Sequence, residues 1–258
     1  MAARIETEIE RRGEGSIARI TICNAAKLNI LNSPLIAALT DAISGVGEDP
    51  DLRAVVLRGE GSRAFIGGAD ITEMAGFTPE TGRAFIVALH GICAAIRACP
   101  VPVIARMEGF TLGGGLEVAA ACDMRIAAEG ARFGMPETRI GIPSVIEAAL
   151  LPQLIGWGRT RRLLFTAEII DAGTAERWGL VEEVVPADGL DAAVERVVAG
   201  VLACGPRAIR LQKALIGAWE EVPVAAAIER GIACFEESWR SDEPGRMMAA
   251  FLAGKRKG

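Results

Sequence analysis

The glycine-rich turn that leads into Glu117 is the part of the sequence whose residue types best suit catalysis. Three consecutive glycines begin at Gly113, and an expected helix of small residues follows them. Glycine lets a ligand approach the main chain because no Cβ stands in the way. A helix N-terminus presents unpaired N–H groups and a partial positive charge, which suit a developing oxyanion. Glu117 lies three residues after Gly114, so its carboxylate is expected on the same helix face.

The same glycines have a structural explanation, since they would also let the helix pack tightly on the strand expected at 100–106. Two further segments favour the catalytic interpretation. Residues 64–71 form a second glycine-rich turn, whose amides could complete an oxyanion site. Glu137 follows a rigid proline, and although a lone loop glutamate is usually solvated, two glutamates near one substrate indicate acid–base catalysis.

Other chemistries fit the sequence less well. Residues 59–64 match the dinucleotide pattern G-x-G-x-x-G/A after a strand, but the next residues, 65–68, do not look like a helix. Neither G-x-x-x-x-G-K-[ST] nor G-x-S-x-G occurs. The only histidine, His90, lies among apolar residues of an expected helix and is interpreted as a packing or surface residue. With six cysteines and no C-x-x-C, a zinc site is not expected.

Composition bounds the class of protein. A chain of 258 residues with 51% hydrophobic and 24% charged residues suits one large domain, or a domain with a small appendage. The net charge of −5 argues against a nucleic-acid partner. The most apolar long window, residues 87–105, contains His90, Arg97 and two prolines, so no membrane span is expected. We therefore expect a soluble, reduced, cytoplasmic protein without a signal peptide.

Apolar periodicity and turn residues predict the elements that must position these groups. The first two thirds mix strands and helices in βα order, and the part beyond Pro143 is mostly helical, which predicts an α/β core followed by a helical region. The expected strands are 4–10, 16–23, 53–57, 100–106, 124–127, 131–133 and 180–185. Three helices are expected before Pro143. The first starts at Ser33 and ends near Gly45 and Gly47, the second runs from the cap at Thr78 to Ala98, and the third spans 116–121.

Several spaced segments resemble, in the same order, the crotonase family of enoyl-CoA hydratases and isomerases, and the hydratases most of all. The likeness runs from Arg4 to about Lys257. It is carried by residues 27–29, 64–74, 109–117, 122–123, 133–137, 141–143, 166–185, 250–251 and 255–257.

The resemblance implies a spiral of ββα turns followed by helices that trimerise. Residues 1–195 would form the spiral core with the active site, and residues 196–258 the helical C-terminal region. The implied partner is an acyl-CoA thioester, with coenzyme A entering as part of the substrate and no metal or other cofactor. A homotrimer or a dimer of trimers is the implied assembly, and no nucleic acid or membrane is an expected partner.

The resemblance also assigns roles to residues. The amides of Ala69 and Gly114 would bind the thioester oxygen, Glu117 would mainly activate a water, and Glu137 would mainly supply the proton to Cα. The basic tail at 255–257 would be an ordinary solvated end or a phosphate contact. The implied substrate- and CoA-binding residues are Lys27, Ala64, Ala69, Asp70, Ile71, Gly113, Gly114 and Pro136.

The sequence departs from the family after Pro143. Hydratases usually carry a glycine-rich segment here, which lines the acyl pocket, whereas this chain has Ser144, two bulky residues and Glu147. We expect Glu147 to be a surface acid of a helix; the alternative is a third acid in the pocket. Hydration of a 2-enoyl-CoA is the expected reaction. The alternatives are an isomerase or another crotonase-family lyase or hydrolase, and a CoA-binding protein without turnover.

Overall fold

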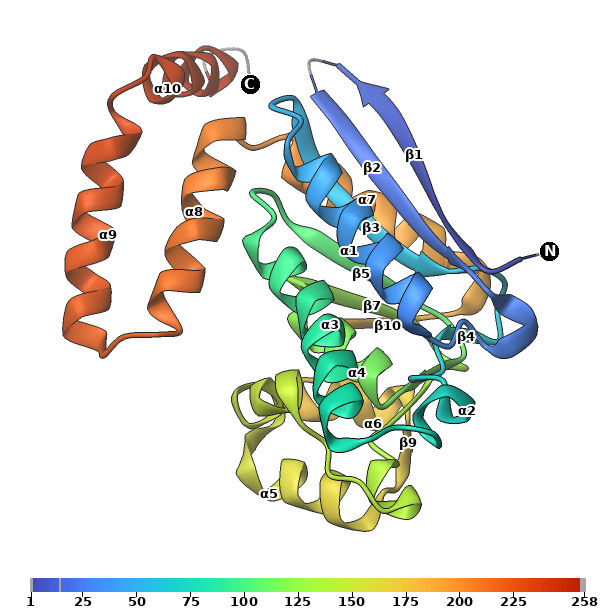
Figure 1. Cartoon of the computed structure of the whole chain (residues 1–258). Helices are drawn as coiled ribbons and strands as arrows, with labels where there is room; N and C mark the ends of the chain where they lie inside the picture. The colour runs from blue at the N-terminus through green and yellow to red at the C-terminus, as the bar shows by residue number, and fades with distance from the viewer. Residues whose placement is uncertain (1, 14, 256–258) are drawn as a thin grey trace. The chain divides into compact units, whose positions relative to one another are not determined.

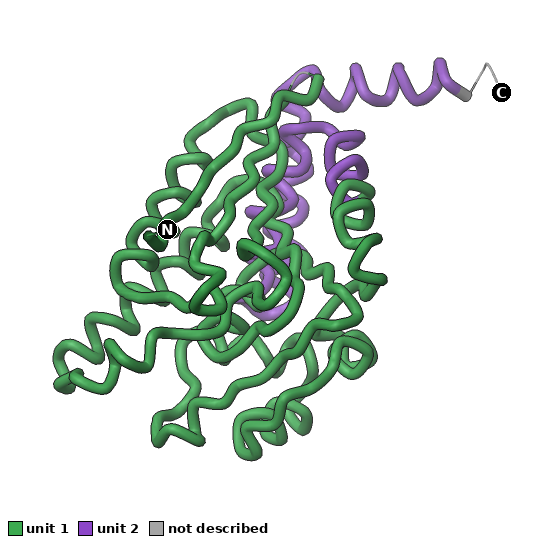
Figure 2. The backbone as a smooth tube through the Cα atoms, turned by 90° about the vertical axis from the view of Figure 1, so that its right-hand side faces the viewer, with its two compact units in different colours: residues 1–196 green, residues 197–258 purple. Residues whose placement is uncertain are grey.

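The computed structural model describes residues 2–13 and 15–255, so Arg256 and Lys257 of the basic tail lie outside the described residues. Two compact units are present, residues 1–196 and 197–258 (Figure 2). The first unit holds all the strands of the described chain and the second is helical (Figure 1). The α/β class predicted from the sequence is therefore confirmed.

A six-stranded sheet forms the base of the first unit, in the order β1-β2-β3-β5-β7-β10. The first two strands form an antiparallel hairpin, and every later pair is parallel. The parallel strands β3 and β5 are nearly continuous apolar runs, as expected for strands buried on both faces. The strands are β1 (Arg4–Arg12), β2 (Gly15–Cys23), β3 (Leu52–Gly59), β5 (Val103–Met107), β7 (Met124–Ala128) and β10 (Glu183–Val185).

A second, four-stranded sheet is built from short strands in the order β4-β6-β8-β9. Strands β4 (Ala64–Ile66), β6 (Phe110–Leu112) and β8 (Arg132–Gly134) follow β3, β5 and β7 in the chain and pair in parallel. Each turn of the chain thus contributes one strand to each sheet. Strand β9 (Ile169–Asp171) pairs antiparallel with β8 and contradicts the helix expected there, because three residues are too few to show a periodicity.

Two helices lie side by side on the larger sheet, α1 (Ser33–Gly47) and α3 (Pro79–Ala98) (Figure 1). Thr78 caps α3 as predicted. Asn32, rather than Ser33, caps α1, since its Oδ1 accepts a hydrogen bond of 3.1 Å from the amide of Leu35. Within the described residues, α3 is the one helix long and apolar enough to cross a membrane by length and composition. It packs in the core through Phe85, Leu89, Ile92, Cys93 and Ile96, and core helices pass the same test.

The remaining helices complete both units. In the first unit they are α2 (Ile71–Met74), α4 (Gly114–Ala121), α5 (Leu151–Thr166), α6 (Ala172–Trp178) and the 3₁₀ helices η1 (Ala25–Lys27), η2 (Glu137–Ile140), η3 (Ile146–Leu150) and η4 (Ala187–Gly189). Helix α7 (Leu190–Leu202) crosses the boundary between the units. The second unit contains α8 (Pro206–Trp219), α9 (Val224–Ser238) and α10 (Glu243–Lys255).

The second unit is held by a buried carboxylate and leaves one helix face uncovered. Glu243 accepts hydrogen bonds from the amides of Arg207 and Ala208 at the start of α8, at 3.0 and 2.8 Å. Five exposed apolar residues, four on α9 and one at its C-cap, recur at spacings of three or four and therefore share one face. They are Val224, Ile228, Ile232, Phe235 and Trp239, here called the α9 stripe.

The buried side chain of Asn29 joins the loop after β2 to the turn that precedes β4. Its Nδ2 donates to the carbonyls of Glu60 and Ala64 at 3.0 and 2.7 Å, and its Oδ1 accepts from the amide of Asn24 at 3.0 Å. A Cβ on Gly59 would lie 2.4 Å from this Nδ2. The glycine pattern at 59–64 thus serves packing, which agrees with setting aside a dinucleotide site.

We expect Asn29→Ala to lower the free energy of unfolding by about 2–4 kcal/mol. It removes the hydrogen bonds of the buried Ala64 carbonyl, the partly buried Glu60 carbonyl and the Asn24 amide. The backbone φ of Asn29 is +53°, which glycine adopts without strain. Asn29→Gly separates the loss of hydrogen bonds from backbone strain, because glycine adopts this φ freely. It should still lose most of this stability in urea denaturation. A glycine variant as stable as the unmutated protein would contradict the role given to the hydrogen bonds.

Candidate active site

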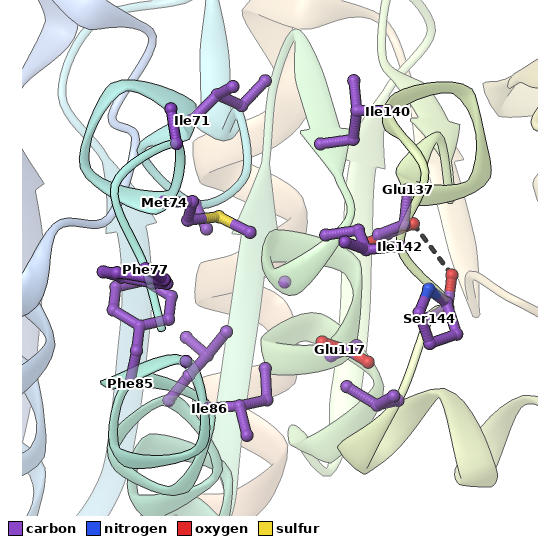
Figure 3. Close-up of a pocket in the computed structure, with 17 residues that line it drawn as sticks. Ile71, Met74, Phe77, Phe85, Ile86, Glu117, Glu137, Ile140, Ile142 and Ser144 are labelled. Atoms are coloured by element: carbon purple, nitrogen blue, oxygen red, sulfur yellow. Dashed lines mark hydrogen bonds between the residues drawn. The ribbon is translucent and has the colours of Figure 1, made fainter. Parts of the chain in front are cut away.

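A cavity of about 550 Å³ in the first unit brings the two glutamates together (Figure 3). Glu117 comes from the first turn of α4 and Glu137 from η2. Apart from these carboxyls and Ser144, the side chains around the cavity are apolar or absent. The lining residues are Ala69, Ile71, Met74, Ala75, Phe77, Gly82, Phe85, Ile86, Leu89, Gly114, Glu117, Glu137, Ile140, Ile142, Pro143, Ser144 and Val145.

Glu117 is a desolvated carboxyl with only 3% of its surface exposed. Its Oε1 accepts a hydrogen bond of 3.3 Å from the amide of Ala148. Burial is the largest cause that raises the pKa of Glu117, and the negative charges of Glu137 and Glu147 act in the same direction. Together, and against the opposing effect of backbone N–H donors, they raise this pKa to about 8. Folding therefore favours the protonated form of Glu117 more than an ordinary glutamate would.

Glu137 lines the same cavity from η2. Its Oε2 accepts a hydrogen bond of 2.8 Å from the hydroxyl of Ser144, and burial raises the pKa of its carboxyl (Figure 3). A Cβ on Gly113 would lie 2.6 Å from Oε1 of Glu137, and the φ of Gly113 is +54°. The backbone conformation of this position therefore requires glycine, and a Cβ here would displace the Glu137 carboxyl. The alternative interpretation of Glu137 as a solvated loop carboxylate is contradicted by its partial burial, its place in the cavity lining and its hydrogen bond from Ser144.

Two amides at the cavity are without acceptors. The residues around Ala69 are fixed to Leu31, whose amide donates to Gly68 O at 2.9 Å and whose carbonyl accepts from Asp70 N at 2.8 Å. Gly114 is the first residue of α4, where the helix supplies no acceptor. In residues 2–13 and 15–255, neither the Ala69 nor the Gly114 amide donates a hydrogen bond to the protein.

The sequence left two explanations of the three glycines open, tight packing and access to a ligand, and the structure separates them by position. Gly114 lines the cavity. A Cβ on Gly115 would lie 2.3 Å from the carbonyl oxygen of Ile66, so this glycine lets α4 pack on β4. Both the packing explanation and the cavity explanation therefore apply, at neighbouring positions.

The expected binding residues are only partly gathered at the cavity. Ala69, Ile71 and Gly114 line it with the two glutamates. Asp70 instead caps α2, with its Oδ1 accepting from the amide of Thr72 at 2.9 Å. The other expected residues outside the lining are Lys27, which is exposed, Ala64, which is buried in β4, and Gly113 and Pro136, which precede Gly114 and Glu137.

Sequence reasoning missed the apolar wall of the cavity. Phe85 and Leu89 recur at helical spacing on α3 and look like core residues, which they also are. No sequence signal separates a helix face that covers a sheet from one that also borders a cavity. The wall could be located only after α3 had been placed beside α4.

The expectation that Glu147 is a surface acid was wrong. Glu147 is 7% exposed, and its Oε1 lies 2.8 Å from Nδ1 of His90. It is not among the residues that line the cavity, so it is not a third acid in the pocket either. His90, with about half of its side chain exposed, is a surface residue as interpreted from the sequence. Within the described residues, no cluster of three or more His, Cys, Asp or Glu could hold a metal ion.

Comparisons with known proteins agree on one family. The family described as enoyl-CoA hydratase/isomerase matches residues 12–257. A crotonyl-CoA hydratase of Syntrophomonas wolfei is 35% identical over 245 residues, which cover 95% of this chain and 94% of the relative. A "(7aS)-7a-methyl-1,5-dioxo-2,3,5,6,7,7a-hexahydro-1H-indene-carboxyl-CoA hydrolase" of Mycobacterium tuberculosis is 40% identical over 206 residues, covering 78% of this chain and 80% of that one. The crystal structure of an enoyl-CoA hydratase from Bacillus anthracis superimposes with a TM-score of 0.90 at 30% identity, covering 96% of both chains.

We expect Glu117→Gln to raise the free energy of unfolding at about pH 8 by roughly 2–4 kcal/mol and to change it little at about pH 4. Because folding raises the pKa of Glu117, its stabilising contribution is complete below the ordinary value of 4.5 and is lost as the pH rises to about 8. Glutamine does not ionise and escapes this loss. Urea denaturation across the range measures it, with the exposed Glu48→Gln as control. An equal gain at both pH values would show that ionisation is not the cause.

Proposed function

The chain belongs to the enoyl-CoA hydratase/isomerase family, and from this we propose that it adds water across the 2,3 double bond of a 2-enoyl-CoA to give a 3-hydroxyacyl-CoA. One observation carries the proposal: a buried glutamate, Glu117, and a partly buried one, Glu137, share a cavity with two amides that have no acceptor. The crotonyl-CoA and enoyl-CoA hydratases among the relatives support the same reaction.

The two amides meet the most demanding requirement of this chemistry. Attack at Cβ places negative charge on the thioester oxygen, which becomes an enolate oxygen. In our proposal this oxygen lies between the N–H groups of Ala69 and Gly114. Preorganised donors of this kind contribute about 3–4 kcal/mol each to transition-state stabilisation in other enzymes. The partial positive charge at the start of α4 acts in the same direction.

The glutamates handle the protons. We assign the base to Glu117, which takes a proton from water as the oxygen bonds to Cβ, and the acid to Glu137, which gives its proton to Cα. Water is thus added as hydroxide and proton, and the pair ends with the same total number of protons. Moving one proton from Glu117 to Glu137 restores the starting state. The raised pKa values of both groups favour retention of a proton in the pair near neutral pH.

The proposed reaction needs no metal and no separate cofactor. We propose that coenzyme A enters only as part of the substrate, with no metal or other cofactor. Its adenine end would lie near Lys27 and the loop from Ala64 to Ile71, with Gly113 and Pro136 supporting the reacting end. We place the reaction in the cytoplasm, in agreement with the reduced compartment expected from the cysteine pattern.

A second copy of this chain is the proposed partner of the α9 stripe. Five large apolar residues on one exposed helix face form the kind of surface that oligomers bury. The family resemblance implies a homotrimer or a dimer of trimers. We propose that the second unit supplies this contact.

A hydrolase or lyase acting on a bulkier acyl group is the second candidate. It is favoured by the relative named as a carboxyl-CoA hydrolase and by the apolar wall around the cavity. Both candidates place the thioester at the same amides. They differ in whether water adds to a double bond of the acyl group or a bond of the acyl-CoA is cleaved.

We expect the unmutated protein to remove the absorbance of the conjugated thioester of crotonyl-CoA, and Glu117→Gln and Glu137→Gln to lose at least about 10²-fold in kcat. Each substitution removes one proton-transfer group while keeping the side-chain shape. The exposed Glu48→Gln is the matched control and should keep full activity. Full activity of Glu137→Gln would exclude the two-acid mechanism. Turnover of a ring-bearing acyl-CoA without hydration of crotonyl-CoA would favour the second candidate.

We expect Ile232→Glu to convert the oligomer into a monomer, because it places a charge in the centre of the α9 stripe. Sedimentation or light scattering measures the mass in solution. Glu229→Gln, at an exposed position of α9 outside the stripe, is the control and should leave the assembly intact. A monomeric unmutated protein would refute the proposed contact.

A further inference from the structure

Glu147 is a buried acid that the proposed reaction does not use. It lies in the first turn of η3, and η3 packs against α4, α5 and α3. Its exposed fraction is 7%. Burying a carboxylate is costly unless its oxygens are paired, so an acid at this position calls for an explanation.

Only one half of this carboxylate is compensated. Oε1 lies 2.8 Å from Nδ1 of His90, within hydrogen-bonding distance. Oε2 is buried and has no hydrogen-bond partner. On the same face of α3, burial and then the charge of Glu147 raise the pKa of the Cys93 thiol. The negative charge of Glu147 therefore acts on its buried neighbours.

The backbone next to the buried Glu147 is strained. The preceding residue, Ile146, has a φ of +32°, a backbone conformation that is an outlier for a β-branched side chain. Such strain persists where the surrounding structure requires it and tends to gather at functional sites. It occurs in the segment where the sequence departs from the glycine-rich pattern of the family.

We propose that Glu147 is a positioning residue whose half-compensated charge makes Glu117 a stronger base toward the attacking water. This rests on the proposed function for its catalytic meaning, but the electrostatic effect can be measured without turnover. Glu147 acts through Glu117, since it does not line the cavity.

The geometry supports an effect of useful size. The charge of Glu147 is one of the causes that raise the pKa of Glu117, after burial and Glu137. The two carboxyls are close, because Ala148, the residue after Glu147, donates its amide hydrogen to Oε1 of Glu117 at 3.3 Å. Between neighbouring, largely buried groups a unit charge shifts a pKa by about one unit or more. A base whose pKa lies closer to neutrality takes a proton from water more readily.

Among the groups named here around Glu147, none is a cation that would cancel the effect of its negative charge on Glu117. Helix α4 presents Glu117, α3 presents His90 and Cys93, and Glu137 acts from η2. The arginines of α5 are engaged elsewhere. Arg159 and Arg162 lie over the ring of Trp178, Arg162 also pairs with Glu168, and Arg161 lies over Trp157.

The first test is the pH dependence of kcat with crotonyl-CoA. Activity that needs ionised Glu117 rises with pH. Removing the charge in Glu147→Gln should move this rise to lower pH by about one unit and reduce the plateau, because the base is weaker. Glu147→Asp keeps the charge and should keep the position of the rise. A loss of activity with an unmoved rise in Glu147→Gln would overturn the proposal, as would equal shifts in both variants.

A second variant guards against a folding defect in Glu147→Gln. His90→Lys changes a half-exposed residue and places a permanent cation beside Glu147, which cancels its field. The same displacement to lower pH is expected. An unmoved rise in a folded His90→Lys protein would contradict the proposal.

An infrared titration separates this inference from the proposed function. The band of the protonated Glu117 carboxyl is identified by its loss in Glu117→Gln, and its titration midpoint is then followed in the other variants. The midpoint should fall in Glu147→Gln and stay in Glu147→Asp and Glu48→Gln, whether or not crotonyl-CoA is hydrated. An unchanged midpoint in Glu147→Gln refutes the role of Glu147. Absent hydration with a shifted midpoint refutes only the reaction.

Discussion

The removal of Glu117 from water is the constraint on which the rest of the site depends. A carboxyl with 3% exposure in the first turn of α4 does not keep its ordinary pKa. The second carboxyl on the same cavity raises this pKa further, because two ionised carboxylates so close together would repel each other. The surrounding structure answers this constraint. Ser144 and the amide of Ala148 donate hydrogen bonds to the pair, and Gly113 leaves room for Glu137.

The scaffold explains why these groups meet. Each turn of the chain adds one strand to the large sheet and one to the small sheet, so the loops after β4 and β6 arrive together at the cavity. These loops carry Ala69 and Gly114. Their separation is maintained by main-chain bonds, with Leu31 holding one loop and Gly134 accepting from the amide of Gly113 in the other. The proposed oxyanion site is thus made by backbone, which side-chain substitution alters only indirectly.

The sequence predicted those features that a local physical rule determines. The Thr78 cap with Pro79 located the start of α3, and the hairpin followed from alternation. Glu117 was predicted from the glycine turn, and Glu137 only through its pairing with Glu117. Features set by distant contacts were missed or mistaken. Strand β9 exists because β8 offers it an edge, and Glu147 is buried because α3 places His90 opposite it. Neither partner is near in sequence.

Helix α3 serves two purposes at once, and this limits how the protein can change its substrate. Phe85 and Leu89 belong to the hydrophobic core and also border the cavity, so trimming them would enlarge the acyl space while opening voids under the sheet. Across the cavity, Ile140 and Val145 have large exposed fractions and lie outside that core. Natural divergence or directed evolution can therefore change the acyl specificity by substitutions on the η2 side with little loss of stability, while the α3 side stays unchanged.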